Sequence, residues 1–308
     1  MARLVVAGTD PEARRLAVAV RAHPGATLIG CAAATIGDAE ERAAEWAVTP
    51  ASPTRLPRKT QGVLISSEVP ERLEWARRWA SEGIAVLVGS PVGATLDEID
   101  ATIEVADRVG VLVGVAEPTL FAPPLVEAMR RLPDLGPLTH LEVRASVAGA
   151  VEAELSEDPF DALRAEADFR RAGAAAMALA TSLGGPERMR LQITVDTDHH
   201  WSASLARDGV PVGALSIERD PRSIPSLSAQ VASATHAMRI DLWPVSDLEI
   251  NGDTAIAPHG LDPTDPVAQL RLSGYRAMVE GFAGVLDRRG GGVCPLGFGR
   301  RVVELAQG

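Results

Sequence analysis

The first 120 residues alternate short apolar runs with amphipathic stretches whose apolar residues recur at helical spacing. The apolar runs cover residues 4–7, 27–33, 62–65, 84–88 and 111–115. Because these runs are apolar at successive positions, both of their faces must be covered, which is the condition of a parallel sheet with helices on either side. Right-handed crossovers between such strands predict an α/β Rossmann-like domain with a doubly wound parallel sheet.

The pattern changes after about residue 121. A helical stretch over 160–183 ends at Gly184-Gly185-Pro186, and Arg207-Asp208-Gly209 is a hairpin signal between two alternating strand patterns. The predicted strands cover 190–195, 201–206, 210–217 and 237–242, and further helices are predicted over 267–286 and 299–306. This half predicts an α+β domain with a large open, mainly antiparallel sheet. A chain of 308 residues is long for one core, so we predict two domains, 1–120 and 121–308.

Three local signals add detail to the first domain. Asp38 is predicted as the N-cap of a helix over 38–47. The proline-rich segment 49–59 interrupts the alternation and predicts a surface loop. Cys31 lies in an apolar run and has no CxxC partner, which favours a small buried thiol over a disulfide or a metal ligand.

Charge and hydropathy exclude several classes of partner. The net charge of -11 argues against nucleic acid or an anionic membrane as the main partner. The chain enters a predicted strand at Arg3 with no long apolar segment before it, so we expect neither a signal peptide nor a membrane span. The expected location is the cytoplasm.

Several short sequence segments resemble those of one family of sugar and inositol dehydrogenases. They are Ala80 to Val88 followed by Ser90-Pro91, Val111 to Val115, Leu135 to Leu138, and Ser182 to Pro186. With the order of the elements, they resemble the glucose–fructose oxidoreductase, inositol dehydrogenase and rhizopine-catabolism (Gfo/Idh/MocA) family along the whole chain. The resemblance implies a first domain that binds NAD(P), and a second that holds a small-molecule ligand and forms the subunit interface. It implies a homodimer or homotetramer, or a hetero-oligomer with an active homologue.

The first strand–helix turn departs from the family pattern. The family has Gly-x-Gly-x-x-Gly there, whose glycines let the backbone approach a diphosphate; this chain has Gly8-Thr9-Asp10-Pro11-Glu12-Ala13. Two carboxylates thus stand where phosphates would lie. At roughly 5 Å and an effective dielectric of about 20, each repulsion is about 3 kcal/mol. A carboxylate there also stabilises the helix dipole without any ligand, so the cofactor roles of Gly8, Thr9 and Asp10 stay open.

Two further turns carry the remaining cofactor candidates. Ser66 and Ser67, after the third strand, either bind a ligand or cap the next helix. Gly89-Ser90-Pro91 stands where the family has Glu-Lys-Pro, whose lysine assists proton transfer from the substrate alcohol. A serine hydroxyl has no cationic form and is too weak an acid to replace an ammonium group at neutral pH.

The proton-transfer pair on the long helix is also absent. The family carries Asp-x-Gly-x-His there, and counting back from the helix end places Arg170 and Ala174 at the two positions. A register shifted by two residues offers Asp168 but places Ala172 at the histidine. In the family, imidazole moves the substrate proton because its pKa lies near neutrality. Neither register supplies a base.

Few other side chains suggest chemistry. Glu117 follows the fifth strand, where open α/β sheets bind ligands, and is interpreted either as a buried acid or as a hinge residue. Arg170 or its neighbour offers a group for an anion. His199 and His200 point to opposite faces of a strand, so we expect no metal site.

These residues predict a family homologue that lacks the usual lysine, aspartate and histidine and has lost hydride transfer. It would act as a non-redox enzyme or as a ligand- or partner-binding subunit, with Ser90, Glu117, Asp168 and Arg170 as candidate cleft residues. The alternative is an active NAD(P)-dependent oxidoreductase on a sugar- or polyol-like substrate, with relocated proton-transfer residues.

Overall fold

The computed structural model describes residues 1–93, 95–148, 159–185, 189–197, 199–220, 225–243, 246–257 and 266–307, with side chains for all of these except 148, 159–169, 266 and 267. The chain forms two compact units. One comprises Met1–Pro118 and Pro263–Val303, and the other comprises Thr119–Asp262 and Glu304–Gly308. The sequence predicts a single domain boundary near residue 120. The first unit has a boundary close to this position, and it also includes the later segment Pro263–Val303.

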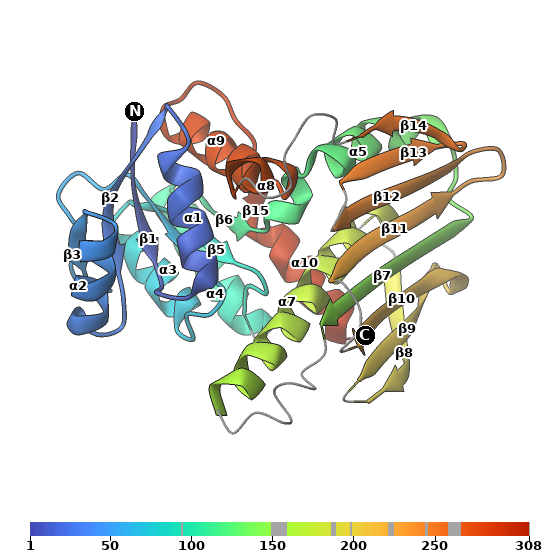
Figure 1. The fold of residues 1–308 in the computed structure, drawn as a ribbon, viewed down its shortest axis with the longest axis horizontal. Coiled ribbons are helices and arrows are strands. Elements are labelled where there is room, and N and C mark those ends of the chain that lie inside the picture. Colours follow the sequence, from blue (N-terminus) through green and yellow to red (C-terminus); the bar gives the residue numbers. More distant parts are fainter. Residues whose placement is uncertain are drawn as a thin grey trace. The chain divides into compact units, whose positions relative to one another are not determined.

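The first unit contains a seven-stranded sheet of order β15-β6-β5-β4-β1-β2-β3 (Figure 1). Its six parallel strands and the short antiparallel β15 are β1 Ala2–Ala7, β2 Ala26–Ala32, β3 Thr49–Ala51, β4 Gly62–Ile65, β5 Ala85–Gly89, β6 Val113–Ala116 and β15 Cys294–Pro295. Strands β4 and β5 are buried at every position, as their uninterrupted apolar sequences require. The predicted doubly wound Rossmann-like sheet is confirmed.

Helices connect these strands, and three helices from the end of the chain join them. The helices are α1 Pro11–Arg21, α2 Ile36–Glu45, α3 Arg72–Ser81, α4 Leu96–Val109, α8 Pro266–Leu272, α9 Tyr275–Leu286 and α10 Leu296–Gln307. The sheet grows outward from β1 in both directions, so right-handed crossovers place α1 and α2 on one face and α3 and α4 on the other. Helix α9 packs against α1, and its Phe282 is fully buried where a side chain on Gly62 would collide with it.

Three sequence predictions for this unit are wrong in detail. Thr35, not Asp38, caps α2: the Thr35 hydroxyl accepts from the Asp38 N–H at 3.2 Å and donates to its carboxylate at 2.7 Å. Part of the predicted loop 49–59 is β3, which pairs with β2 at the sheet edge. The predicted helix over 267–286 is two helices, because Gly274 takes a left-handed φ of 84° between them.

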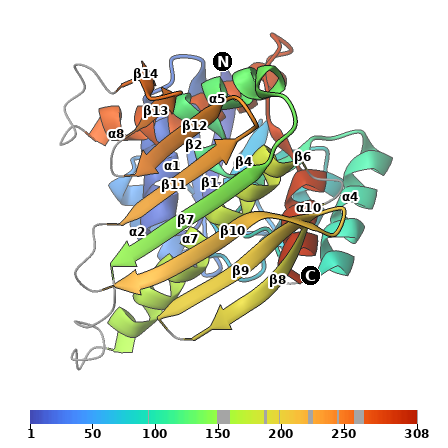
Figure 2. The same cartoon turned by 90° about the vertical axis from the view of Figure 1, so that its right-hand side faces the viewer.

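The second unit contains an eight-stranded sheet of order β14-β13-β12-β11-β7-β10-β9-β8 (Figure 2). The strands are β7 His140–Ala148, β8 Met189–Asp196, β9 His200–Arg207, β10 Val210–Asp220, β11 Ser226–Ala232, β12 Ala237–Trp243, β13 Asp247–Ile250 and β14 Asp253–Ile256. All neighbouring pairs are antiparallel except β7 with β10. The predicted large, mainly antiparallel sheet is confirmed, as is the β9–β10 hairpin, where Asp208 and Gly209 both have positive φ.

Two helices cover one face of this sheet, and no helix among the described residues of this unit covers the other, which we call the open face. Helix α7, Pro159–Gly184, contacts β7, β10 and β11, and α5, Pro123–Leu135, contacts β12 and β13; Figure 2 shows both behind the strands. Strand β7 follows the expected alternation, since Leu141 and Val143 are buried whereas Glu142 and Arg144 are not. The edge strand β8 does not: Ile193 is 51% exposed although its sequence alternates cleanly.

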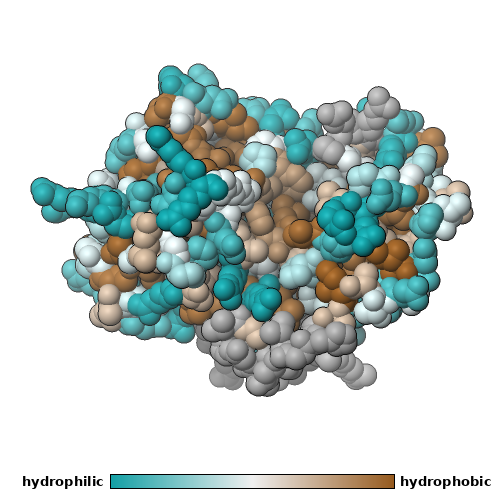
Figure 3. Space-filling view, turned by 90° about the horizontal axis from the view of Figure 1, so that it is seen from above, coloured by the Kyte–Doolittle hydropathy of each residue, from teal (hydrophilic) through white to brown (hydrophobic). Residues whose placement is uncertain are grey.

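The surface mixes polar and apolar side chains. Figure 3 shows hydrophilic and hydrophobic residues interspersed over the face that it presents, as is usual for a chain with 46% hydrophobic residues. Among the helices described, none is both long enough and apolar enough to span a membrane.

Candidate functional site

The carboxyl ends of β1, β4 and β5 meet at one edge of the parallel sheet, where α/β proteins bind ligands. This edge brings together most residues that the sequence assigns to a cofactor site. Gly8 follows β1, Ser66 and Ser67 follow β4, and Gly89 ends β5. The carbonyl of Thr9 accepts a hydrogen bond from Arg42 at 3.0 Å.

Asp10 is the N-cap of α1. Its Oδ1 accepts hydrogen bonds from the backbone N–H groups of Glu12 at 2.8 Å and Ala13 at 3.1 Å. The hydroxyl of Ser66 donates to the same oxygen at 2.8 Å. The carboxylate therefore accepts from two of the free N–H donors at the helix start, where its charge also favours the helix dipole.

Glu12 turns inward and joins α1 to the turn after β4. Its side chain is 3% exposed, and its Oε2 accepts from the backbone N–H of Ser67 at 2.9 Å. The Ser67 hydroxyl donates to the same oxygen, and the Ser66 hydroxyl lies 3.3 Å from it. The two serines thus hold the start of α1. They do not cap α3, whose N-cap is Glu71 without a side-chain hydrogen bond.

Arg72 supplies positive charge beside this network. Burial lowers the pKa of its guanidinium, and the carboxylates of Glu12, Glu68 and Glu98 act in the opposite direction. Its Nε and Nη2 donate to the carbonyl of Pro91 at 2.9 and 2.6 Å, and Nη1 donates to the carbonyl of Val69 at 3.1 Å. Arg72 is not among the site residues predicted from the sequence, because no sequence pattern around it indicates these partners.

Gly89, Ser90 and Pro91 pack tightly against the serine turn. A Cβ on Gly89 would lie 2.3 Å from the backbone nitrogen of Ser67, so a larger residue does not fit there. The Ser90–Pro91 bond is cis, and Ser90 is 7% exposed. The position of the family lysine therefore holds a buried hydroxyl beside a carbonyl that Arg72 already binds.

These residues do not fit the diphosphate of a dinucleotide. Such a group needs free N–H donors at the start of α1, and the side chains around these donors must be neutral or positively charged. Here the N–H groups of Glu12, Ala13 and Ser67 donate to the carboxylates of Asp10 and Glu12. Gly8 leaves no further space, since a Cβ there would lie 2.8 Å from Asp10 Oδ2.

Glu117, Asp168 and Arg170 belong to other elements of the structure. Glu117 lies at the end of β6 and is 5% exposed. Burial and then the charge of Glu117 raise the pKa of the Cys294 thiol and Arg301 lowers it, with a net value of about 12. Arg170 is an exposed residue of α7 in the second unit. Asp168 lies in the same helix, and its side chain is outside the described residues.

The small residues of α7 serve packing. Ala172 and Ala174, the two positions at which the family histidine would fall, are 2% and 7% exposed. A Cβ on Gly173 would lie 3.3 Å from Cδ1 of Ile217 in the sheet. Because the helix contacts the sheet through such small side chains, a histidine ring has little room there.

The described residues include no group of three or more His, Cys, Asp or Glu side chains that could hold a metal ion. His200 Nδ1 lies 3.6 Å from Glu218 Oε1, its register partner across the β9–β10 hairpin.

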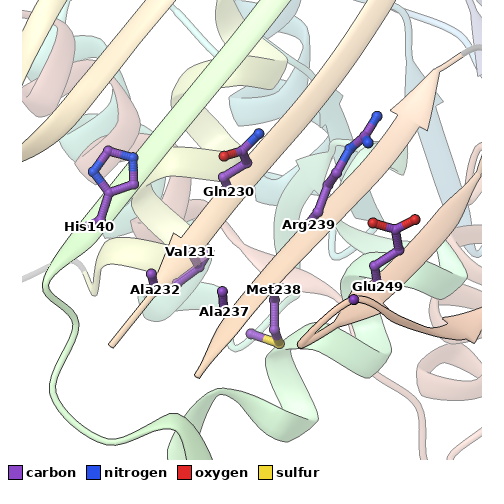
Figure 4. A pocket seen from close by; sticks show the side chains of 9 residues that line it. His140, Gln230, Val231, Ala232, Ala237, Met238, Arg239 and Glu249 are labelled. Carbon is purple, nitrogen blue, oxygen red and sulfur yellow. The ribbon is translucent and has the colours of Figure 1, made fainter. Parts of the chain in front are cut away.

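A pocket of about 200 Å³ lies in the second unit. Figure 4 shows that its polar side chains come from four neighbouring strands, with His140 on β7, Gln230 on β11, Arg239 on β12 and Glu249 on β13. Gln230 is the register partner of Arg239, which in turn faces Glu249. Arg239 already pairs with Asp241 at 2.9 Å.

Solved structures with a similar fold extend over almost the whole chain. A protein assigned provisionally as a myo-inositol dehydrogenase from Sinorhizobium meliloti has a TM-score of 0.78 and 15% identity, with 100% of this chain and 95% of that chain covered. GenD2 from gentamicin A biosynthesis, in complex with NAD, has a TM-score of 0.75 and 17% identity over 99% and 92% of the two chains. The UDP-N-acetylglucosamine 3-dehydrogenase GnnA from Acidithiobacillus ferrooxidans has a TM-score of 0.74 and 17% identity over 99% and 95% of the two chains.

No protein-family model and no curated protein matches the sequence. The resemblance is confirmed at the level of the fold: the chain has the two-domain architecture of the Gfo/Idh/MocA dehydrogenases.

Proposed function

We propose that this protein does not transfer hydride and uses the dehydrogenase fold as a non-redox enzyme or as a ligand- or partner-binding subunit. The observation that carries the proposal is that two carboxylates occupy this edge of the sheet. Asp10 accepts from two N–H donors at the start of α1, and Glu12 accepts from the N–H of Ser67 after β4. Ser90 and Ala174 add to it, since neither supplies the cation or the base that alcohol oxidation requires.

The alternative is an active oxidoreductase with relocated proton-transfer groups. Its support is the fold, since GenD2 has a similar structure and binds NAD, and the nicotinamide itself would supply the hydride chemistry. Glu117 and Asp168 are the acids that would have to move the proton. No contact of the described residues favours this function over the first.

One experiment separates the two functions. The purified protein is incubated with NAD+ or NADP+ and a panel of sugars, inositols and other polyols, and the absorbance of reduced nicotinamide is followed. We expect no turnover from the wild type or from Ser90→Lys, because the lysine alone does not restore a base. Turnover by the wild type would establish the alternative, and turnover by Ser90→Lys alone would refute the assigned need for histidine.

The open face of the second sheet favours a second copy of the chain as partner. Register pairs place Ser216, Arg144, Ser228 and Asp241 in one row across β10, β7, β11 and β12. Small hydroxyls between charges of both signs make this row suitable for close contact with an identical sheet. A homodimer or homotetramer is therefore the proposed assembly, with a hetero-oligomer as the alternative that a pull-down from the native host would reveal.

A further inference from the structure

Glu12 connects two turns that are distant in sequence at the point where the fold would hold a diphosphate. Its Oε2 accepts the Ser67 N–H at 2.9 Å and the Ser67 hydroxyl, and lies 3.3 Å from the Ser66 hydroxyl. We propose that Glu12 is an internal anion that replaces the diphosphate and closes this edge of the sheet against nucleoside diphosphates, NAD(P) included. The inference deepens the proposed function and rests on it for the expectation that the protein needs no dinucleotide.

The chemistry of the donors supports this role. A carboxylate and a phosphate are both acceptor-only groups, and both suit a backbone N–H and hydroxyls near a helix N-terminus. Ser67 supplies two donors to one oxygen, and Arg72 lies close enough for Glu12 to influence its pKa. These are the groups of an anion site, and a side chain of the same chain already occupies it.

The closure depends on burial as well as on charge. An exposed glutamate could rotate away from an incoming phosphate, whereas Glu12 is 3% exposed. Asp10 shares the Ser66 hydroxyl with it, which ties the two carboxylates to one donor. Displacing Glu12 would therefore leave a carboxylate without its hydrogen bonds inside the unit.

A merely structural Glu12 and a closing Glu12 differ in one respect. If the residue only stabilises the fold, its removal lowers stability and creates no affinity. If it closes an anion site, its removal also leaves the N–H and the hydroxyl of Ser67 without their acceptor, beside the positive charge of Arg72. A phosphate-bearing ligand can then take its place.

The test is isothermal titration of the full chain with ADP and, separately, with NADH. We expect no measurable heat for the wild type at millimolar ligand. We expect at least a tenfold gain in ADP affinity for Glu12→Gly and a smaller gain for Glu12→Gln, which removes the charge but keeps the volume. Glu74→Gly is the matched control: it also replaces a helical glutamate of this unit by glycine, but Glu74 is a 60% exposed side chain paired with Arg78.

Two results would overturn the inference. The first is wild-type binding of ADP or NADH as tight as that of Glu12→Gly. The second is unchanged ADP affinity in a Glu12→Gly protein whose circular dichroism shows that it is folded; if this variant does not fold, unchanged affinity in folded Glu12→Gln decides against the inference. Wild-type binding of NADH without turnover would overturn only this inference, whereas turnover would also overturn the proposed function.

Discussion

The carboxylate of Glu12 accepts a hydrogen bond from the backbone N–H of Ser67 with 2.9 Å between the two atoms, although 55 positions separate the residues. This bond joins the β1–α1 turn to the turn after β4. In the dehydrogenase fold these two turns are neighbours at the ligand edge of the sheet. Here they are held to each other, so the same contact bears on both stability and binding.

Ser67→Ala should lower the free energy of unfolding by about 1.5–3 kcal/mol, the usual contribution of a hydrogen bond to a charged group. The variant loses the hydroxyl that donates to Glu12 and keeps the backbone donor. Urea denaturation measures the change. The control is Ser81→Ala, whose exposed hydroxyl binds the Arg78 carbonyl at a helix end and should contribute less than about 0.5 kcal/mol. Equal losses in the two variants would contradict the assigned role of Ser67.

Gly89→Ala should destabilise the first unit by about 3 kcal/mol or more, because the new Cβ would lie 2.3 Å from the Ser67 nitrogen and neither backbone can move freely. Gly37→Ala makes the same change where no atom lies within 4 Å. It should leave stability unchanged or raise it by up to about 1 kcal/mol, because alanine favours the helix. Thermal unfolding of the two variants provides the comparison, and a well-tolerated alanine at position 89 would show that the turns are not packed as described.

Both cysteines should be unreactive in the folded protein. Cys31 and Cys294 are 0% and 8% exposed, and burial raises the pKa of each thiol to about 12. The thiolate is the reactive form, so a thiol reagent at pH 8 should label neither residue until denaturant is added, when both should react. Rapid labelling of native protein at either cysteine would contradict the burial of that strand.

Asp247→Asn should stabilise the second unit at neutral pH. Burial and then the neighbouring Asp241 raise the pKa of the Asp247 carboxyl, and Arg239 lowers it. A carboxyl with a raised pKa in the folded state favours folding in its protonated form, so its ionisation destabilises the protein as the pH rises. The gain from the substitution should therefore appear at pH 7 and shrink towards pH 4 in urea denaturation. Asp253→Asn, an exposed aspartate of β14, should change stability at neither pH; a gain at pH 7 that persists unchanged at pH 4 would contradict the assigned cause.

Ser228→Arg should dissociate the proposed homo-oligomer. The residue lies in the serine-rich row of the open face, opposite Arg144 and Asp241 in register. A large cation there would prevent close approach of a second sheet. Light scattering coupled to gel filtration should show a dimer or tetramer for the wild type and a monomer for the variant, with Ser81→Arg on α3 as control. A monomeric wild type would refute the assembly.

Sequence patterns predicted the parts of this fold that depend on neighbouring residues. Uninterrupted apolar runs such as β4 and β5 indicate strands covered on both faces, and Asp208-Gly209 specifies its hairpin through positive φ values. Boundaries were less well predicted where two local signals compete. Thr35 and Asp38 both suit an N-cap, and the structure uses the threonine as cap and the aspartate as its partner.

The residue types at the site were predictable from the sequence, but the hydrogen bonds between them were not. The sequence shows that Asp10 and Ala13 replace the expected glycines, that Glu12 adds a second carboxylate, and that Ser66 and Ser67 are polar turn residues. It does not show that Glu12 turns inward to Ser67, because a contact across 55 positions depends on the strand order of the sheet. For the same reason the interaction of Arg72 with the Pro91 carbonyl had no signal in the sequence.

The discontinuity of the first unit has a consequence for synthesis on the ribosome. Phe282 of α9 packs over Gly62, and Cys294 and Pro295 add the last strand beside β6. A growing chain that has produced only its first 118 residues therefore leaves apolar surface on α1 and β4 uncovered while some 150 further residues are translated. We therefore expect chaperones to bind the nascent amino-terminal part through this apolar surface until the late helices have been synthesised.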